Sequence, residues 1–309
     1  MAELHPQCRA FLDLDPDAPE IWTIPLYEAR AGGHTPVDFS GPIDRTVKTE
    51  HRYFTGPTAD LPITIYSPDG SGPFNGMVYF HGGGWVFNDI SKYDAQLAAM
   101  AKMTNSVIVS VNYQKAPEHK FPIPFNDCYS AFEWTVANAE ELHIDPKKIG
   151  IGGDSAGGNL ASAVALKIRD EGRDHLAYQW LVYPCNGTDF ETPSYHENAT
   201  GYGLTRDGMI WLWDQYLSGP EDLKNPYAVP LNATKYEGLA PAIIITAGFD
   251  PLHDDGEMYK ANLEAAGVPV AYREYPDMIH GFFNYGSYID EGISVREYFA
   301  GEINRILQE

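Results

Sequence analysis

The sequence predicts an α/β protein in which a mostly parallel central sheet is flanked by helices. From about residue 77 onward, short apolar runs alternate with longer segments of helical character, which is typical of parallel strands joined by helices on both faces of a sheet. The glycine-rich run at 150–158 lies between an apolar strand and an alanine-rich helix, where such sheets bind ligands. A chain of 309 residues can form one large domain or two medium ones.

The elements follow in order along the chain. Residues 1–45 are rich in proline and acidic residues, and one helix is expected near 19–29. Apolar and polar residues then alternate enough to predict antiparallel strands at 46–54 and 61–66, before a turn at 67–73. In the alternating part, the expected strands are 77–80, 107–112, 148–152, 180–183, 242–247 and 269–275, and the expected helices are 93–103, 124–139, 156–170, 257–266 and one at the C-terminus.

Residues 186–230 interrupt this alternation with an aromatic, loop-rich insertion. An insertion between two parallel strands is a natural lid over the ligand end of the sheet. We therefore expect a core made of 46–185 and 231–309, with 1–45 and 186–230 packing together as a cap that roofs the site.

Composition argues against nucleic acid and membranes as partners. The formal net charge of −22 would be repelled by a phosphate backbone. No segment approaches the roughly 20 apolar residues of a membrane span, and the first 19 residues lack the features of a signal peptide, so a cytoplasmic protein is expected. The acidic surface is expected to serve solubility or a salty habitat, with steering of cationic substrates as the alternative. The three cysteines are expected to be reduced thiols. The sequence shows no Cys/His cluster that would bind a metal.

Ser155 lies in the most informative run, G-x-S-x-G, between the apolar strand and the helix. This pattern is typical of a nucleophile elbow, a sharp turn that forces the serine into strained geometry and lifts its hydroxyl above the sheet. Side chains two positions away would clash, which explains Gly153 and Gly157. The turn leaves the N–H of Ala156 free at a helix N-terminus, where negative charge is favoured.

The run His81-Gly82-Gly83-Gly84 directly follows another predicted strand. Glycines at a strand end leave backbone N–H groups unshielded, and such a run supplies the remaining oxyanion-hole donors in lipases and esterases. A glycine-rich loop alone could equally be a plain turn, so the interpretation depends on the elbow downstream.

A carboxylate at the end of a later strand could orient a histidine base. Asp250 comes just after the strand at 242–247, and its task would be to accept the Nδ1–H of that histidine. Asp254 and Asp255 are rival candidates, but they are expected in the first turn of the next helix, where acidic residues are favoured by the helix dipole.

His280 is the candidate base because it follows the last predicted strand, downstream of the acid. The chain order Ser155, Asp250, His280 is the order expected for an α/β-hydrolase. His253, beside the acid, is the alternative base on positional grounds.

Four motifs together resemble the hormone-sensitive-lipase-like family of carboxylesterases, in its G-D-S-A-G branch. They are His81–Gly84, Gly153–Gly157, Asp250-Pro251-Leu252 and His280-Gly281-Phe282. The resemblance implies the α/β-hydrolase fold with a mainly helical cap.

Further stretches extend the resemblance from about residue 20 to the end. Residues 112–119 resemble the family's Y-R-L-A-P-E-H run, although Gln114-Lys115 stands where the family has Arg-Leu. Residues 201–213 resemble the family's cap, and residues 226–228 resemble the segment that returns from the cap to the core. By this resemblance the oxyanion donors are Gly83, Gly84 and Ala156, while His81 and Gly82 shape the loop. A homodimer through an edge strand is expected on the same basis.

These roles imply a serine esterase that works through an acyl-enzyme. Ser155 attacks an ester carbonyl while His280 takes its proton, and Asp250 stabilises the imidazolium. The three backbone N–H groups hold the oxyanion, and water then releases the acid; no metal or other cofactor is needed. The resemblance implies small-molecule acyl or aryl esters of short to medium chain length. The candidate pocket residues are Trp85, Phe87, Tyr202, Leu204, Met209 and Trp213.

Three alternative functions compete with this interpretation. A dinucleotide fingerprint fails because Ser155 stands where the third glycine is required, and a P-loop fails at Gly158-Asn159. A small-molecule receptor derived from the fold would be expected to lack the histidine, and His280 is present. Amidase, lactonase or deacetylase activity on the same triad stays open, because pocket shape decides the leaving group.

Overall fold

The computed structural model describes residues 3–32, 37–173 and 176–308. In these residues eight strands form one sheet, in the order β1-β2-β4-β3-β5-β6-β7-β8. The first two strands and the β2–β4 pair are antiparallel, and every later pair is parallel, which confirms the predicted α/β class. The strands are β1 (Lys48–Thr55), β2 (Asp60–Ser67), β3 (Phe74–Phe80), β4 (Ser106–Val111), β5 (Ile144–Asp154), β6 (Leu176–Val182), β7 (Ala242–Phe249) and β8 (Val270–Ile279).

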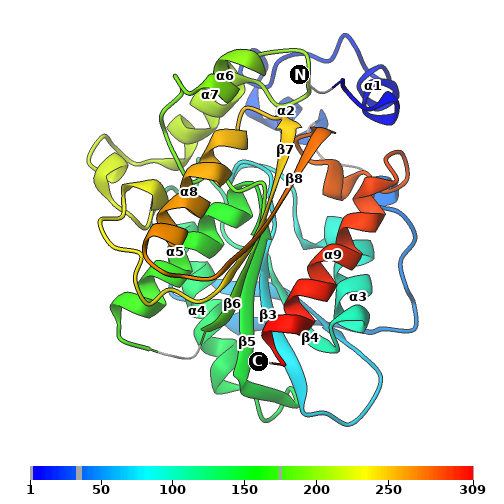
Figure 1. Ribbon diagram of the computed structural model, residues 1–309, viewed down its shortest axis with the longest axis vertical. Coiled ribbons are helices and arrows are strands. Elements are labelled where there is room, and N and C mark those ends of the chain that lie inside the picture. Colours follow the sequence, from blue (N-terminus) through cyan, green and yellow to red (C-terminus); the bar gives the residue numbers. More distant parts are fainter. Residues whose placement is uncertain (1–2, 33–36, 174–175, 309) are drawn as a thin grey trace.

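Helices cover both faces of the sheet, as Figure 1 shows. Helices α3 and α9 lie on one face, and α4, α5 and α8 lie on the other. The helices are α1 (Pro6–Leu12), α2 (Leu26–Gly32), α3 (Asp94–Met103), α4 (Ile123–Ala137), α5 (Ala156–Asp170), α6 (Pro193–Glu197), α7 (Arg206–Tyr216), α8 (His253–Ala265) and α9 (Glu291–Ile306). Short 3₁₀ turns occur at η1 (Val37–Ser40), η2 (Ile90–Tyr93), η3 (Asp222–Lys224), η4 (Pro230–Asn232) and η5 (Phe282–Asn284).

The N-terminal segment departs from the sequence prediction. A helix was expected near 19–29, but α2 begins only at Leu26 and a separate helix, α1, lies earlier. Pro25 accounts for the later start, because a proline disfavours helical geometry in the residue before it and can begin a helix itself. Helix α1 begins at Pro6, and the side chain of His5 accepts a hydrogen bond from the N–H of Gln7 at 3.2 Å.

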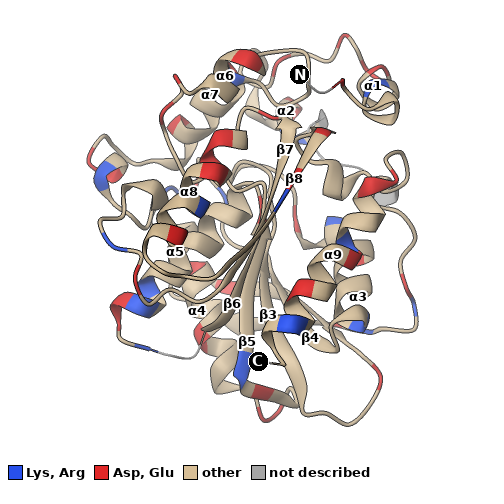
Figure 2. Ribbon diagram, viewed as in Figure 1, with Lys and Arg blue, Asp and Glu red and all other residues tan. Residues whose placement is uncertain are grey.

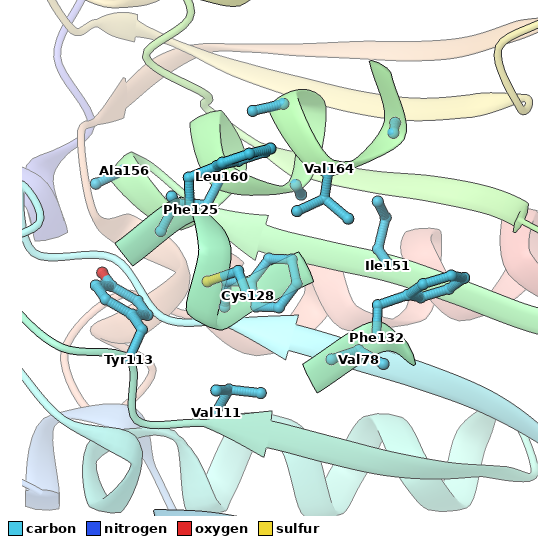
Figure 3. Packing of buried hydrophobic residues seen from close by; sticks show 14 of the residues in the cluster. Val78, Val111, Tyr113, Phe125, Cys128, Phe132, Ile151, Ala156, Leu160 and Val164 are labelled. Atoms are coloured by element: carbon cyan, nitrogen blue, oxygen red, sulfur yellow. The ribbon is translucent and has the colours of Figure 1, made fainter. Parts of the chain in front are cut away.

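The core on the α4 and α5 face is built by side chains of both helices against the central strands. Phe125 and Phe132 on α4 and Leu160 on α5 point toward Val78 and Ile151 of the sheet (Figure 3). All five side chains are buried. Burial of this apolar surface is the main favourable contribution to folding, and it fixes the strands whose ends carry the polar motifs.

The N-terminal segment and the insertion after β6 gather at the end of the sheet to which β7 and β8 point, as Figure 1 shows. Helices α1, α2, α6 and α7 lie there together. The N–H of His5 donates to the carbonyl of Asp277 at 2.9 Å, and the ring of Phe11 stacks on Tyr285 with centroids 4.1 Å apart. These contacts hold α1 against the carboxyl ends of the strands.

Acidic residues are distributed over several helices and loops instead of being gathered on a single element, as Figure 2 shows. Such a distribution is consistent with the expected role of charge in solubility. None of the helices in the described part of the chain is both long and apolar enough to cross a membrane.

Asp254 and Asp255 do begin a helix, but they are not simple surface charges. Asp255 is fully buried and accepts a hydrogen bond from the N–H of Gly187 at 2.9 Å. Asp254 accepts one from the N–H of Ser194, also at 2.9 Å. The two carboxylates therefore fasten the start of the insertion to α8. Burial raises the pKa of Asp255 to about 7, partly offset by the hydrogen bond from Gly187.

The raised pKa of Asp255 predicts a pH-dependent stability. The pKa of this carboxyl group is near 4 in the unfolded chain and about 7 in the folded one. Its contribution to the free energy of unfolding is therefore complete below about pH 4 and is lost as the pH rises through 7. Asp255→Asn cannot titrate. We expect its melting temperature to rise relative to the wild type between about pH 5 and pH 8 in thermal unfolding. Asp69→Asn, on the surface, serves as the control. If the difference in melting temperature between Asp255→Asn and the wild type did not change across this pH range, the raised pKa of the buried Asp255 would be contradicted.

The packing predicts a large loss of stability for Phe132→Ala. The change leaves a cavity between α4 and the sheet and should lower the free energy of unfolding by about 3–5 kcal/mol. Leu14→Ala is the control, since this side chain is 56% exposed, and it should change the same quantity by about 0.5 kcal/mol or less. Urea denaturation measures both. A loss below about 1 kcal/mol for Phe132→Ala would be inconsistent with the packing.

Candidate active site

Ser155 stands at a sharp turn between β5 and α5. Its backbone angles, φ 54° and ψ −121°, lie outside the regions that residues other than glycine usually adopt. A Cβ atom on Gly157 would lie 1.9 Å from the carbonyl oxygen of Phe80, and one on Gly153 would lie 2.3 Å from the carbonyl of Gly157. Both glycines are therefore required by space, which is the reason predicted from the sequence.

The turn brings Ser155 to His280, which follows β8. The His280 Nε2 atom lies 3.0 Å from Ser155 Oγ, and Nδ1 lies 2.7 Å from Asp250 Oδ2. Asp250 follows β7, is fully buried and also accepts a hydrogen bond from the N–H of Leu252 at 2.8 Å. These distances fit an imidazole whose Nδ1–H donates to the carboxylate while Nε2 accepts from the serine hydroxyl.

The rival residues lie in other arrangements. His253, in α8, pairs with Asp254 at 3.3 Å and with Glu274 at 3.5 Å. Asp254 and Asp255 bond the insertion instead, as described above. The structure thus brings Ser155 together with the first-choice acid and base, and it gives the rivals different partners.

Two residues near this group have no local sequence signal. The Asn198 side chain, from the insertion, donates to the carbonyl of Asp250 at 3.2 Å and to that of Gly248 at 3.1 Å. The ring of Tyr183, at the end of β6, lies 4.6 Å from the His280 ring between centroids. Both side chains restrict the loops that carry the acid and the base.

The glycine run after β3 folds into a tight loop beside Ser155. The carbonyl of Gly83 accepts hydrogen bonds from the N–H groups of Val86 and Phe87, at 3.0 and 2.8 Å. Gly83 and Gly84 have φ angles of 113° and 58°. Within the described part of the chain, no group accepts a hydrogen bond from the N–H of Gly83, Gly84 or Ala156, so these donors remain available to a ligand.

His81 is held inside the protein as a neutral side chain. It is fully buried, its ring stacks on Tyr113 with centroids 4.3 Å apart, and its Nδ1 lies 2.8 Å from the carbonyl oxygen of Gly82. Burial lowers the pKa of His81 to about 3, with the nearby Lys115 charge as the next contribution. A neutral, stacked imidazole is consistent with the loop-shaping role that the resemblance implies.

A cavity of about 610 Å³ leads to Ser155 and His280. Of the candidate pocket residues, Phe87, Leu204 and Met209 line it. The N-terminal segment also lines it, through side chains that sequence reasoning did not single out. They include Phe11, Leu12, Ile21 and Trp22.

Three predicted pocket residues do not line the cavity. Trp85 stacks on Tyr216 with centroids 4.3 Å apart and also contacts Trp213 at 4.5 Å. The three rings therefore form the packing between the glycine loop after β3 and α7. Tyr202 packs on Phe249 at 4.9 Å. The pocket assignment of Trp85, Tyr202 and Trp213 was therefore wrong, because their aromatic surface is used to bury the cap.

Comparison with known proteins places this geometry in a family. A family model described as alpha/beta hydrolase fold matches residues 77–284. Carboxylic ester hydrolase LipN of Mycobacterium tuberculosis is 38% identical over 235 residues, which cover 74% of this chain and 62% of LipN. Carboxylesterase NlhH of the same species is 38% identical over 232 residues, covering 73% of this chain and 72% of NlhH.

A solved structure agrees over nearly the whole chain. Ester-hydrolase EH1AB1, from the metagenome of Lake Arreo and in complex with a bipyridine phosphonate derivative, has a TM-score of 0.93 and 32% identity. The match covers 99% of this chain and 100% of that chain. The chain therefore belongs to the hormone-sensitive-lipase-like family of carboxylesterases, which have the α/β-hydrolase fold.

Proposed function

We propose that this chain hydrolyses small carboxylic esters, with Ser155 as nucleophile, His280 as general base and then acid, and Asp250 as the group that orients the imidazole. The hydrogen-bonded series from Asp250 through His280 to Ser155 carries this proposal. Proton transfer from the serine to His280 accompanies attack on the carbonyl carbon. The imidazolium so formed is stabilised by the adjacent carboxylate and then protonates the leaving alkoxide.

The N–H groups of Gly83, Gly84 and Ala156 are the proposed oxyanion donors. The first two lie in the loop after β3, and the third lies at the N-terminus of α5, where the helix dipole favours negative charge. Water then attacks the acyl-enzyme, with His280 again accepting the proton, and the carboxylic acid leaves.

The cavity supports short- to medium-chain acyl or aryl esters as substrates. Its volume of about 610 Å³ falls within the range of sites for small molecules. Phe87 and Leu204 contribute apolar surface, while the glycines and Ser155 contribute the polar groups. The names printed for LipN and NlhH, an ester hydrolase and a carboxylesterase, support the same reaction.

The segments 1–45 and 186–230 act in this proposal as a cap over a core formed by 46–185 and 231–309. Described residues of both cap segments line the cavity, among them Trp22 and Met209. Leu212 on α7 packs against the oxyanion loop at Gly84. A Cβ atom on Gly84 would lie 2.4 Å from Leu212 Cδ2. The cap therefore restricts the space in which the acyl group and the leaving group are held.

Ser155→Ala should abolish the hydrolysis of 4-nitrophenyl esters. The wild type should cleave a series of increasing acyl length, with the highest rate at short chains, because the cavity has the size of a small-molecule site. The variant lacks the nucleophile, so its rate should fall by about 10⁵-fold or more. Retention of wild-type turnover in a folded Ser155→Ala would overturn the proposed function. Circular dichroism confirms folding.

Gly84→Ala should impair catalysis through its collision with α7. The new methyl group would lie 2.4 Å from Leu212 and displace an oxyanion donor, the loss of which typically lowers the rate by about 10²–10³-fold. Leu212→Ala in the same chain removes the collision and should restore part of the lost kcat. Ile210→Ala is the matched control, since Ile210 is on the same helix but 37% exposed. Equal kcat values for Gly84→Ala with and without Leu212→Ala would contradict this mechanism.

A further inference from the structure

Asp154 precedes the nucleophile and is 2% exposed. Its carboxylate accepts four hydrogen bonds from different parts of the chain. Oδ1 accepts from the hydroxyl of Tyr79 at 2.9 Å and the N–H of Gly82 at 2.8 Å. Oδ2 accepts from the hydroxyl of Tyr93 at 3.0 Å and the side-chain amide of Asn284 at 2.9 Å.

These four donors fix the position of both carboxyl oxygens. A carboxylate has about four lone-pair sites, so two donors on each oxygen use its full accepting capacity. A protonated Asp154 would need an acceptor for its O–H, and among the four partners only the hydroxyls of Tyr79 and Tyr93 can turn to accept one. Burial acts in the opposite direction and raises the pKa of Asp154, while the four hydrogen bonds lower it. Burial is the larger effect, so the pKa of Asp154 lies above its usual value, and the four donors fix the position of the carboxyl group.

Two of the donors belong to loops that carry the proposed catalytic groups. Gly82 begins the oxyanion loop, immediately before Gly83. Asn284 lies in η5, four residues after His280. A Cβ atom on Gly82 would lie 2.5 Å from Asp154 Oδ2, so the carboxylate and the loop are in close contact. One buried anion thus joins the elbow, the oxyanion loop and the histidine loop.

The network continues beyond Asn284 to a buried cation. The side-chain amide of Gln96 donates to Asn284 Oδ1 at 2.8 Å and to the hydroxyl of Ser40 at 2.9 Å. Arg296, 3% exposed, donates to the carbonyl of Ser40 at 2.7 Å. No carboxylate among the described residues pairs with Arg296 within 4.0 Å. The amide of Asn284 is therefore fixed from both sides, with its N–H directed at Asp154.

We propose that Asp154 is a positioning residue of the esterase reaction: its carboxylate holds the oxyanion loop through Gly82 and the histidine loop through Asn284 at the distances that the tetrahedral intermediate requires. This inference rests on the proposed function of Ser155 and His280. In this role the carboxylate acts through Gly82 and Asn284 and not on the ester itself. It acts on the rate of the chemical step because small displacements of catalytic groups are costly, up to about 100-fold for 1 Å.

Asp154→Asn tests the proposal without changing the size of the side chain. At the Oδ2 position the new NH₂ group leaves the Asn284 amide without its acceptor. At the Oδ1 position it leaves the N–H of Gly82 with the hydroxyl of Tyr93, at 2.9 Å, as its remaining acceptor. We expect kcat for a soluble 4-nitrophenyl ester to fall by between about 10- and 100-fold, while KM stays within about three-fold. Asn284→Ala should lower kcat in the same manner. In the double variant, kcat should fall by less than the product of the two single fold-losses, since both changes act on the same hydrogen bond between Asn284 and Asp154.

Asp127→Asn is the matched control. Asp127 lies in α4, is also buried, and accepts a hydrogen bond from the N–H of Gln114 at 2.9 Å. It should keep the wild-type kcat even where its stability is reduced. Wild-type kcat in folded Asp154→Asn overturns the proposal, as does a loss carried by KM. If Asp154→Asn does not fold, wild-type kcat in Asn284→Ala overturns it. Ser155→Ala keeps the two proposals separate: loss of turnover there supports the esterase assignment, whatever the Asp154 variants show.

Discussion

The close approach of α5 to the end of β3 is the constraint on which the rest of the site depends. The carbonyl oxygen of Phe80 would be 1.9 Å from a Cβ on Gly157, so strand and helix meet with no space for a side chain. At this contact Ser155 adopts its strained turn, and its hydroxyl lies 3.0 Å from His280 Nε2. Backbone strain of this kind persists only where the surroundings fix it, and the buried core between α4, α5 and the sheet supplies that support.

Charge at the site is organised by burial. Asp250 and Asp154 are both buried carboxylates, and each is stabilised by specific donors rather than by an arginine or lysine. Asp250 receives the imidazole Nδ1–H, so its charge acts on the proton of the base. Asp154 accepts the backbone N–H of Gly82, so in our proposal it sets the position of the glycine loop after β3. Unpaired buried charges are costly, and complete hydrogen bonding reduces that cost.

Sequence reasoning found what depends on local pattern. Gly153, Gly157 and the strand-end positions of Asp250 and His280 follow from steric and topological rules that act over a few residues. Trp85 was misassigned, because an aromatic residue after the loop gives no indication of whether it faces a ligand or another ring. Helix α1 was missed, since its seven residues are stabilised by contacts with β8 and Tyr285 instead of by their own pattern. Asp154 was seen only as part of a motif, because its four partners come from three distant segments of the chain.

Covalent labelling tests the central assignment most directly. A fluorophosphonate reacts with a serine only when a base removes its proton and donors receive the developing charge. Peptide mapping by mass spectrometry after treatment of the intact protein should place one adduct on Ser155, and Ser155→Ala should remain unlabelled. An adduct on another residue, or labelling of the variant to the same extent, would contradict the account.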